Sequence, residues 1–90
     1  GLANMLAAWE AGCRVFDAGS GGIGGCPYAP GATGNTAMED AVWMFERMGV
    51  STGLDWQKLL AAAEMAAGIP GAMAGGRVRG VPAAQRGLAA

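Results

Sequence analysis

Apolar side chains recur at helical spacing in three stretches of the chain, and this pattern predicts three helices. The first helix is expected over residues 2–11 and ends before Gly12, where a glycine can take the left-handed conformation of a C-cap. The second is expected over residues 36–48 and ends before Gly49 in the same way. The third is expected over residues 56–67, between an N-cap aspartate and a Gly-Ile-Pro segment.

A run of a different pattern follows the first helix. Residues 14–18, Arg-Val-Phe-Asp-Ala, predict a β-strand. One strand alone leaves backbone N–H and C=O groups unpaired on both edges, so its partners are expected outside the 90 residues. The order helix, strand, loop, helix, helix is that of a βα repeat, and it predicts an α/β fold that is part of a (β/α)8 barrel. A complete barrel needs about 250 residues, so the chain is expected to be about the last third of one.

The apolar period ends with the third helix. Residues 1–70 are therefore predicted to form the folded, barrel-derived part of the chain. From Gly71 onward the Gly, Ala, Arg and Pro content shows no period. Residues 71–90 are predicted to be a loosely ordered tail.

Composition and charge exclude several classes of function. The formal net charge is −1, with six Lys and Arg residues in all, so no basic field is present that would attract nucleic acid. No apolar run reaches the roughly 18 residues that a membrane span needs, and no membrane partner is expected. Two cysteines and no histidine do not supply the four ligands of a structural zinc site.

The segment between the predicted strand and the second helix is the candidate for chemistry. Residues 19–35 contain seven glycines, with the Cys26-Pro27 pair near the centre and Asn35 at the end. Ordering so many glycines costs backbone entropy. Glycines are nevertheless common where the backbone must approach a ligand closely, because they have no side chain in the way. Because loops after strands carry the active site in barrels of βα repeats, this glycine loop is predicted to be an active-site loop.

The end of the glycine loop resembles a known family. Its sequence from Gly24 to Asn35, Gly-Gly-Cys-Pro-Tyr-Ala-Pro-Gly-Ala-Thr-Gly-Asn, is similar to the C-terminal signature of the 3-hydroxy-3-methylglutaryl-CoA (HMG-CoA) lyases. The resemblance runs from Gly1 to Leu60 and includes Val-Phe-Asp-Ala before the loop. It implies a metal-dependent TIM barrel of leucine degradation and ketone-body formation. The chain would then hold helix 7, strand 8, the active-site loop, helix 8 and an extra C-terminal helix.

The resemblance also assigns roles to residues. Cys26 matches the family's catalytic cysteine, and Asn35 matches an asparagine that helps to ligate a divalent cation, Mg²⁺ or Mn²⁺. The family cleaves HMG-CoA to acetyl-CoA and acetoacetate. Gly22, Gly24 and Gly25 are predicted to let the loop close over the acyl group and exclude water.

Each assignment leaves an alternative open. The Cys26 thiol is the proton donor to the acetyl-CoA carbon or a close participant in that step, or else it is a buried inert thiol. Asn35 offers the neutral carbonyl oxygen that hard cations accept, or it caps the second helix. Glu39 fits a capping box with Thr36, or it binds and orients the residues that ligate the metal.

The rest of the family's site has no counterpart in the 90 residues. Its other metal ligands, an Asp and a His-x-His segment, and its catalytic Arg would lie upstream. The isolated chain is therefore expected to be inactive. For the full-length enzyme, the resemblance implies an acyl-CoA substrate, a homo-oligomer, and a cytoplasmic location or, in a eukaryote, the mitochondrial matrix.

Three alternative functions stay open. A related TIM-barrel acyl-CoA lyase fits the same motif, whereas synthases that condense acetyl-CoA with a 2-oxo acid typically carry Glu-Arg near the position of Cys26-Pro27. A non-enzymatic Gly/Ala-rich peptide is the alternative from another class, with its glycines serving close helix packing. That peptide predicts a Cys13–Cys26 disulfide, whereas the lyase predicts free thiols.

Overall fold

The computed structural model describes residues 1–24 and 34–81, so the predictions for Cys26 and Gly25 lie outside the described residues. These ranges form three α-helices, α1 (Leu2–Glu10), α2 (Met38–Arg47) and α3 (Trp56–Ala67). Two short 3₁₀ turns accompany them, η1 (Ser20–Gly22) and η2 (Val78–Gly80). Within the described ranges, no helix is long and apolar enough to cross a membrane.

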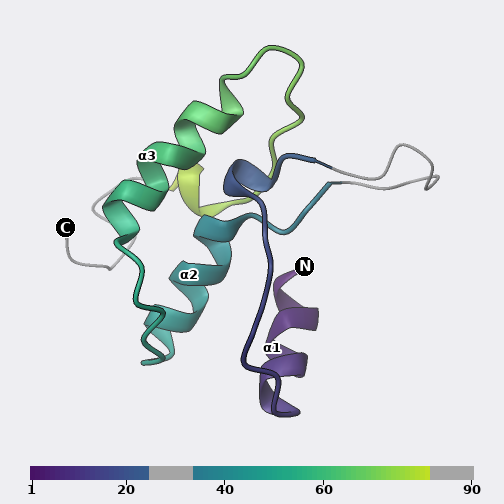
Figure 1. Ribbon diagram of the computed structural model, residues 1–90, viewed down its shortest axis with the longest axis vertical. Coiled ribbons are helices and arrows are strands. Elements are labelled where there is room, and N and C mark those ends of the chain that lie inside the picture. The colour runs from purple at the N-terminus through teal and green to yellow at the C-terminus, as the bar shows by residue number, and fades with distance from the viewer. Residues whose placement is uncertain (25–33, 82–90) are drawn as a thin grey trace.

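Helix α2 lies between the other two helices (Figure 1) and buries side chains on both sides. On one side, Ala41 and Phe45 form an apolar cluster with Met5 of α1. The Phe45 ring lies 6.3 Å from the Trp9 ring and 5.5 Å from the Phe16 ring, centroid to centroid. These are ordinary distances for packed aromatic pairs. Helix α1 thus packs against α2 through Leu2, Met5 and Trp9, which lie at helical spacing on one face.

The other side of α2 packs against α3 and the C-terminal segment. Val42 is buried there with Trp56, Leu60 and Val78. The Asp55 side chain accepts a hydrogen bond from the Lys58 backbone N–H at 3.2 Å, which caps the first turn of α3. The predicted third helix is confirmed with the expected bounds.

Residues 13–18 run in extended form from α1 towards η1 (Figure 1), but the described part of the chain has no β-ladder. The strand predicted over residues 14–18 is therefore not formed in this structure. The physical reason is that a strand needs neighbouring strands to pair with, and in the described chain the first residue to find a partner lies just after this stretch. That residue is Gly19, which makes an isolated parallel bridge with Ala37. Within this stretch Val15 is 85% exposed.

The segment after α3 differs from the predicted loose tail. Residues 75–81 pack back across the N-terminal half of α2, and Val78 is buried in the core. Asp40 accepts hydrogen bonds from the backbone N–H groups of Arg77 and Val78, each at 2.9 Å. Since the Asp40 carboxylate binds two backbone N–H groups, this segment is attached to α2 although its sequence has no apolar periodicity. The prediction of a loose tail is wrong for this part of residues 71–90.

Candidate active site at the glycine loop

The glycine loop begins in a tight turn fixed to the start of α2. The Gly19 N–H donates to the Thr36 carbonyl at 3.0 Å, and the Met38 N–H donates to the Gly19 carbonyl at 2.9 Å. After this bridge the chain turns through η1, where Gly21 and Gly22 take φ values of 67° and 70°. Residues with a Cβ rarely adopt these angles, so the two glycines are required by the turn itself.

Asn35 lies beside the first residues after η1. Its Nδ2 donates to the Ile23 carbonyl at 2.9 Å. The N-cap of α2 is Ala37, and no side chain caps it. The alternative in which Asn35 caps this helix is therefore wrong, because the Asn35 side-chain amide binds the Ile23 carbonyl at the other end of the loop instead.

Asn35 also borders a polar hollow of about 380 Å³ that Asp17, Ala18, Gly34 and Thr36 complete. Asp17 comes from the end of the extended segment, where the chain enters the glycine loop. A carboxylate and a side-chain amide thus line the same space, and oxygen atoms of both kinds suit Mg²⁺. Among the described residues, no group of three His, Cys, Asp or Glu side chains could hold a metal ion. Asp17 and Asn35 could therefore supply two of the ligands of a Mg²⁺ site, and the described residues do not supply a complete set.

Two of the predicted loop glycines lie close to Asn35: a Cβ would collide with it at Gly24 and would be tightly packed against it at Gly22. Gly24 has a φ of 102°, and a Cβ there would lie 2.6 Å from Asn35 Nδ2. A Cβ at Gly22 would lie 3.2 Å from the Asn35 carbonyl oxygen. Both glycines therefore allow Asn35 to approach the backbone of residues 22–24.

Glu39 is fully buried, with 0% of its surface exposed. Its Oε1 accepts a hydrogen bond from the Gly21 N–H at 2.9 Å, and its Oε2 lies 3.2 Å from Arg79 Nη1. The capping box with Thr36 is wrong, because the two carboxylate oxygens bind the Gly21 N–H and Arg79 rather than the Thr36 N–H. Glu39 fixes the turn that opens the glycine loop.

The sequence pattern does not indicate a role for Arg79 or Asp40. Arg79 lies 40 positions from Glu39, and Asp40 binds backbone groups 37 and 38 positions away. The one local hint was an adjacent pair of acids in the first turn of a helix, a position that favours negative charge. Such a pair is usually solvated, so burial of both was not predicted.

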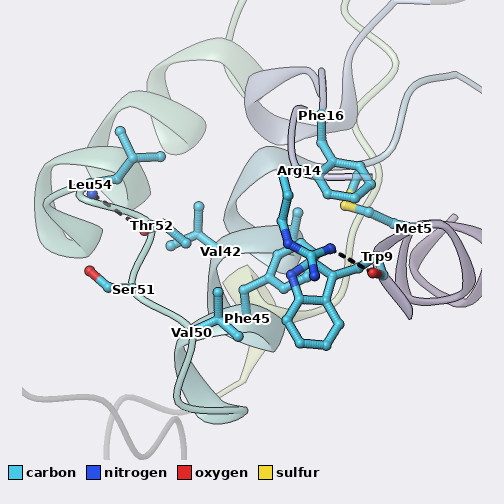
Figure 2. A pocket seen from close by; sticks show the side chains of 11 residues that line it. Met5, Trp9, Arg14, Phe16, Val42, Phe45, Val50, Ser51, Thr52 and Leu54 are labelled. Carbon is cyan, nitrogen blue, oxygen red and sulfur yellow. Dashed lines mark hydrogen bonds between the residues drawn. The ribbon is translucent and has the colours of Figure 1, made fainter. Parts of the chain in front are cut away.

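A second hollow, of about 320 Å³, lies between α1, α2 and residues 50–54. Figure 2 shows Trp9 and Phe45 at one end, with the Arg14 side chain beside the Trp9 ring. The Arg14 guanidinium carbon lies 4.7 Å from that ring centroid, and Nη1 donates to the Trp9 carbonyl at 2.7 Å. Arg14 is thus engaged in fixing the end of α1. Cys13 next to it is an exposed, free thiol. The other cysteine, Cys26, lies outside the described residues, so the prediction of two free thiols stays a prediction.

Comparison with known proteins shows the family of this chain. The HMGL-like family model matches residues 1–66, and the chain belongs to this family. Similar proteins are lyases. The chain is 56% identical over 64 residues to (R)-citramalyl-CoA lyase of Chloroflexus aurantiacus, covering 71% of this chain and 20% of that protein. It is 54% identical over 63 residues to hydroxymethylglutaryl-CoA lyase YngG of Bacillus subtilis, covering 70% and 21%.

The human mitochondrial hydroxymethylglutaryl-CoA lyase is 54% identical over 61 residues, covering 68% of this chain and 19% of that one. The chain thus spans about a fifth of the length of these relatives. Its structure matches a crystal structure of the B. subtilis HMG-CoA lyase with a TM-score of 0.77 and 46% identity. That match covers 88% of this chain and 26% of the other, and it is consistent with a piece of a TIM barrel.

Proposed function

We propose that this chain forms the C-terminal part of a divalent-cation-dependent lyase that cleaves HMG-CoA to acetyl-CoA and acetoacetate, and that residues 1–90 alone are inactive. The observation that carries the proposal is the placement of Asn35. Its amide donates to the Ile23 carbonyl at the edge of a polar hollow, and Asn35 follows the Cys26-Pro27-Tyr28 motif seven positions later in the sequence. Membership of the HMGL-like family supports the same reaction class.

The reaction breaks one carbon–carbon bond. Removal of the proton from the tertiary hydroxyl lets that oxygen form the carbonyl of acetoacetate, as the bond to the thioester-bearing CH₂ group breaks. The electron pair of that bond stays on the CH₂ carbon as the enolate of acetyl-CoA. We assign Cys26 as the group that delivers a proton to this carbon, in keeping with general acid catalysis by a placed side chain. The glycines close the loop around the acyl group and keep water out.

Asn35 and Asp17 are the side chains in this chain that would contact a bound Mg²⁺ or Mn²⁺, since both line the hollow and both offer oxygen donors. When bound, the cation acts as a Lewis acid that favours ionisation of the substrate hydroxyl. The Ile23 carbonyl accepts from Asn35 Nδ2, so the amide is oriented before any cation arrives. We also propose that the full-length enzyme is a homo-oligomer of the cytoplasm or of a mitochondrial matrix.

A second substrate is favoured by one finding. The (R)-citramalyl-CoA lyase of C. aurantiacus is as similar to this chain as the HMG-CoA lyases are. Cleavage of the same bond in citramalyl-CoA gives acetyl-CoA and pyruvate, so the loop chemistry is common to both. The group that differs sits on the hydroxyl-bearing carbon. Discrimination therefore depends on side chains that reach this group.

The test is an assay of the full-length protein, with the residues encoded upstream of Gly1, on both thioesters. We expect acetyl-CoA and acetoacetate from HMG-CoA only when Mg²⁺ or Mn²⁺ is added. Asn35→Ala is expected to raise the cation concentration needed for half-maximal rate by roughly 10- to 100-fold. Asn35→Asp, which keeps an oxygen donor, serves as the matched control. Pyruvate as the faster product would identify the citramalyl-CoA lyase, and unchanged metal dependence in Asn35→Ala would remove Asn35 from the site.

Gly24→Ala is a second probe of the Asn35 position. The added Cβ would meet Asn35 Nδ2 at 2.6 Å, so the amide must move away from the Ile23 carbonyl. We expect a rise of about tenfold in the cation requirement, measured by titration with Mn²⁺. Gly53→Ala is the control, because Gly53 also has a positive φ, of 74°, but a Cβ there meets nothing within 4 Å. An equal response of the two variants would show that backbone strain alone is responsible.

A further inference from the structure

Both polar backbone groups of Gly21 are bonded to parts of the chain far away in sequence. Its N–H donates to the buried Glu39 carboxylate at 2.9 Å. Its carbonyl accepts from the Gly75 N–H at 2.8 Å. The turn that opens the glycine loop is therefore clamped between α2 on one side and the segment after α3 on the other.

The segment after α3, residues 75–81, is itself anchored to α2. Asp40 binds the N–H groups of Arg77 and Val78, and the Val78 side chain enters the core. Gly76 lies so close to α2 that a Cβ would come within 2.8 Å of the Ala37 Cβ. These contacts bring the next side chain, Arg79, over the same buried junction.

Arg79 completes the clamp from the C-terminal side. Its Nη1 lies 3.2 Å from Glu39 Oε2 and donates to the Gly75 carbonyl at 3.3 Å. Its Nε lies 3.7 Å from Glu64 Oε1 on α3. Charge-assisted hydrogen bonds are stronger than neutral ones, and a buried carboxylate without its cation is strongly unfavourable. The Glu39 side chain keeps its orientation towards Gly21 because Arg79 holds its second oxygen.

We propose that residues 75–81 act as a strap across the base of the glycine loop, with Arg79 as the positioning residue. The strap holds η1 through Glu39 and Gly75, and η1 leads directly to Ile23, whose carbonyl orients Asn35. Arg79 acts on the site through Glu39 and touches no reacting atom. This inference rests on the proposed lyase function for its effect on rate, but the clamp itself is testable without it.

The first test measures the clamp directly. In the full-length protein, Arg79→Met is expected to speed hydrogen exchange of the amides of residues 19–22 by about tenfold, because the opening of this turn no longer breaks the ion pair. Arg79→Lys, which keeps the charge, should restore most of the protection. Arg77→Met is the matched control, since only the backbone N–H of Arg77 is used and the substitution retains it. Exchange in Arg79→Met equal to that in Arg77→Met would overturn the proposal.

The second test measures the consequence for the reaction. Arg79→Met is expected to lower kcat by roughly 10- to 100-fold, since small displacements of a site cost this much, while KM for the thioester stays within about twofold. Arg79→Lys should recover most of kcat. If the unsubstituted protein cleaves neither thioester, the proposed function fails while the exchange data still decide on the strap. If exchange rises but kcat does not change, the strap's role in the reaction is overturned.

Discussion

Replacing Glu39 by alanine is expected to lower the free energy of unfolding of the full-length protein by about 3 kcal/mol. The substitution leaves the buried Gly21 N–H without its acceptor and removes the buried carboxylate that pairs with Arg79. Removal of one member of a buried ion pair costs about 3–5 kcal/mol, and an unmet buried donor alone costs about 1–3 kcal/mol. The lower end is expected because the Arg79 side chain is 21% exposed and can turn towards water.

Glu64→Ala provides the control for this substitution. Glu64 pairs with the same arginine, but its side chain is 60% exposed, and the two atoms are 3.7 Å apart. A pair of this kind contributes at most about 1 kcal/mol. Urea unfolding at constant m-value measures both changes. Equal losses for Glu39→Ala and Glu64→Ala would contradict the view that burial and the Gly21 bond make Glu39 the larger contributor.

The helices could be predicted from the sequence because their signals are local. The third helix has its apolar period, its N-cap Asp55 and its terminating Gly68 within fourteen residues of one another, and the structure confirms its bounds. The start of the second helix was predicted less well. Thr36 and Glu39 have the spacing of a capping box, but Glu39 is drawn into the core by Gly21 and Arg79. A distant partner overrode a local pattern.

Two other features depend on contacts that no local pattern encodes. A strand over residues 14–18 needs neighbouring strands, and the described chain offers only the Gly19–Ala37 bridge. The segment around Val78 lacks an apolar period, but Asp40 binds its backbone N–H groups, and every non-proline residue supplies such a donor. The side chains of this segment therefore do not indicate that it packs against α2.

The candidate site was predicted by a different kind of signal. A motif of fixed order indicates Asn35, and the structure places this residue against the backbone that Gly22 and Gly24 leave open. The motif did not indicate Asp17, which lines the same hollow from the preceding segment. Motif spacing identifies residues within one loop, whereas a shared hollow depends on how two segments meet.

The largest effect on the reaction is expected from Cys26→Ala in the full-length protein. If the thiol delivers a proton to the acetyl-CoA carbon, its loss should lower kcat by roughly 100- to 10,000-fold, the usual contribution of a general acid. KM should change little, because a side chain that acts on the departing carbon contributes mainly in the transition state. Steady-state rates of thioester cleavage, with saturating cation, measure both parameters.

Cys13→Ala is the matched control, because Cys13 is the exposed free thiol of the described chain and its Sγ donates a hydrogen bond to the nearby Val15 carbonyl, at 3.3 Å. We expect its kcat to stay within about twofold of the unsubstituted enzyme, as for most exposed positions away from a site. The comparison separates the two thiols by position, since both variants remove the same group. A Cys26→Ala enzyme as active as Cys13→Ala would show that the loop thiol is structural, and the proton would then have to come from a group outside these 90 residues.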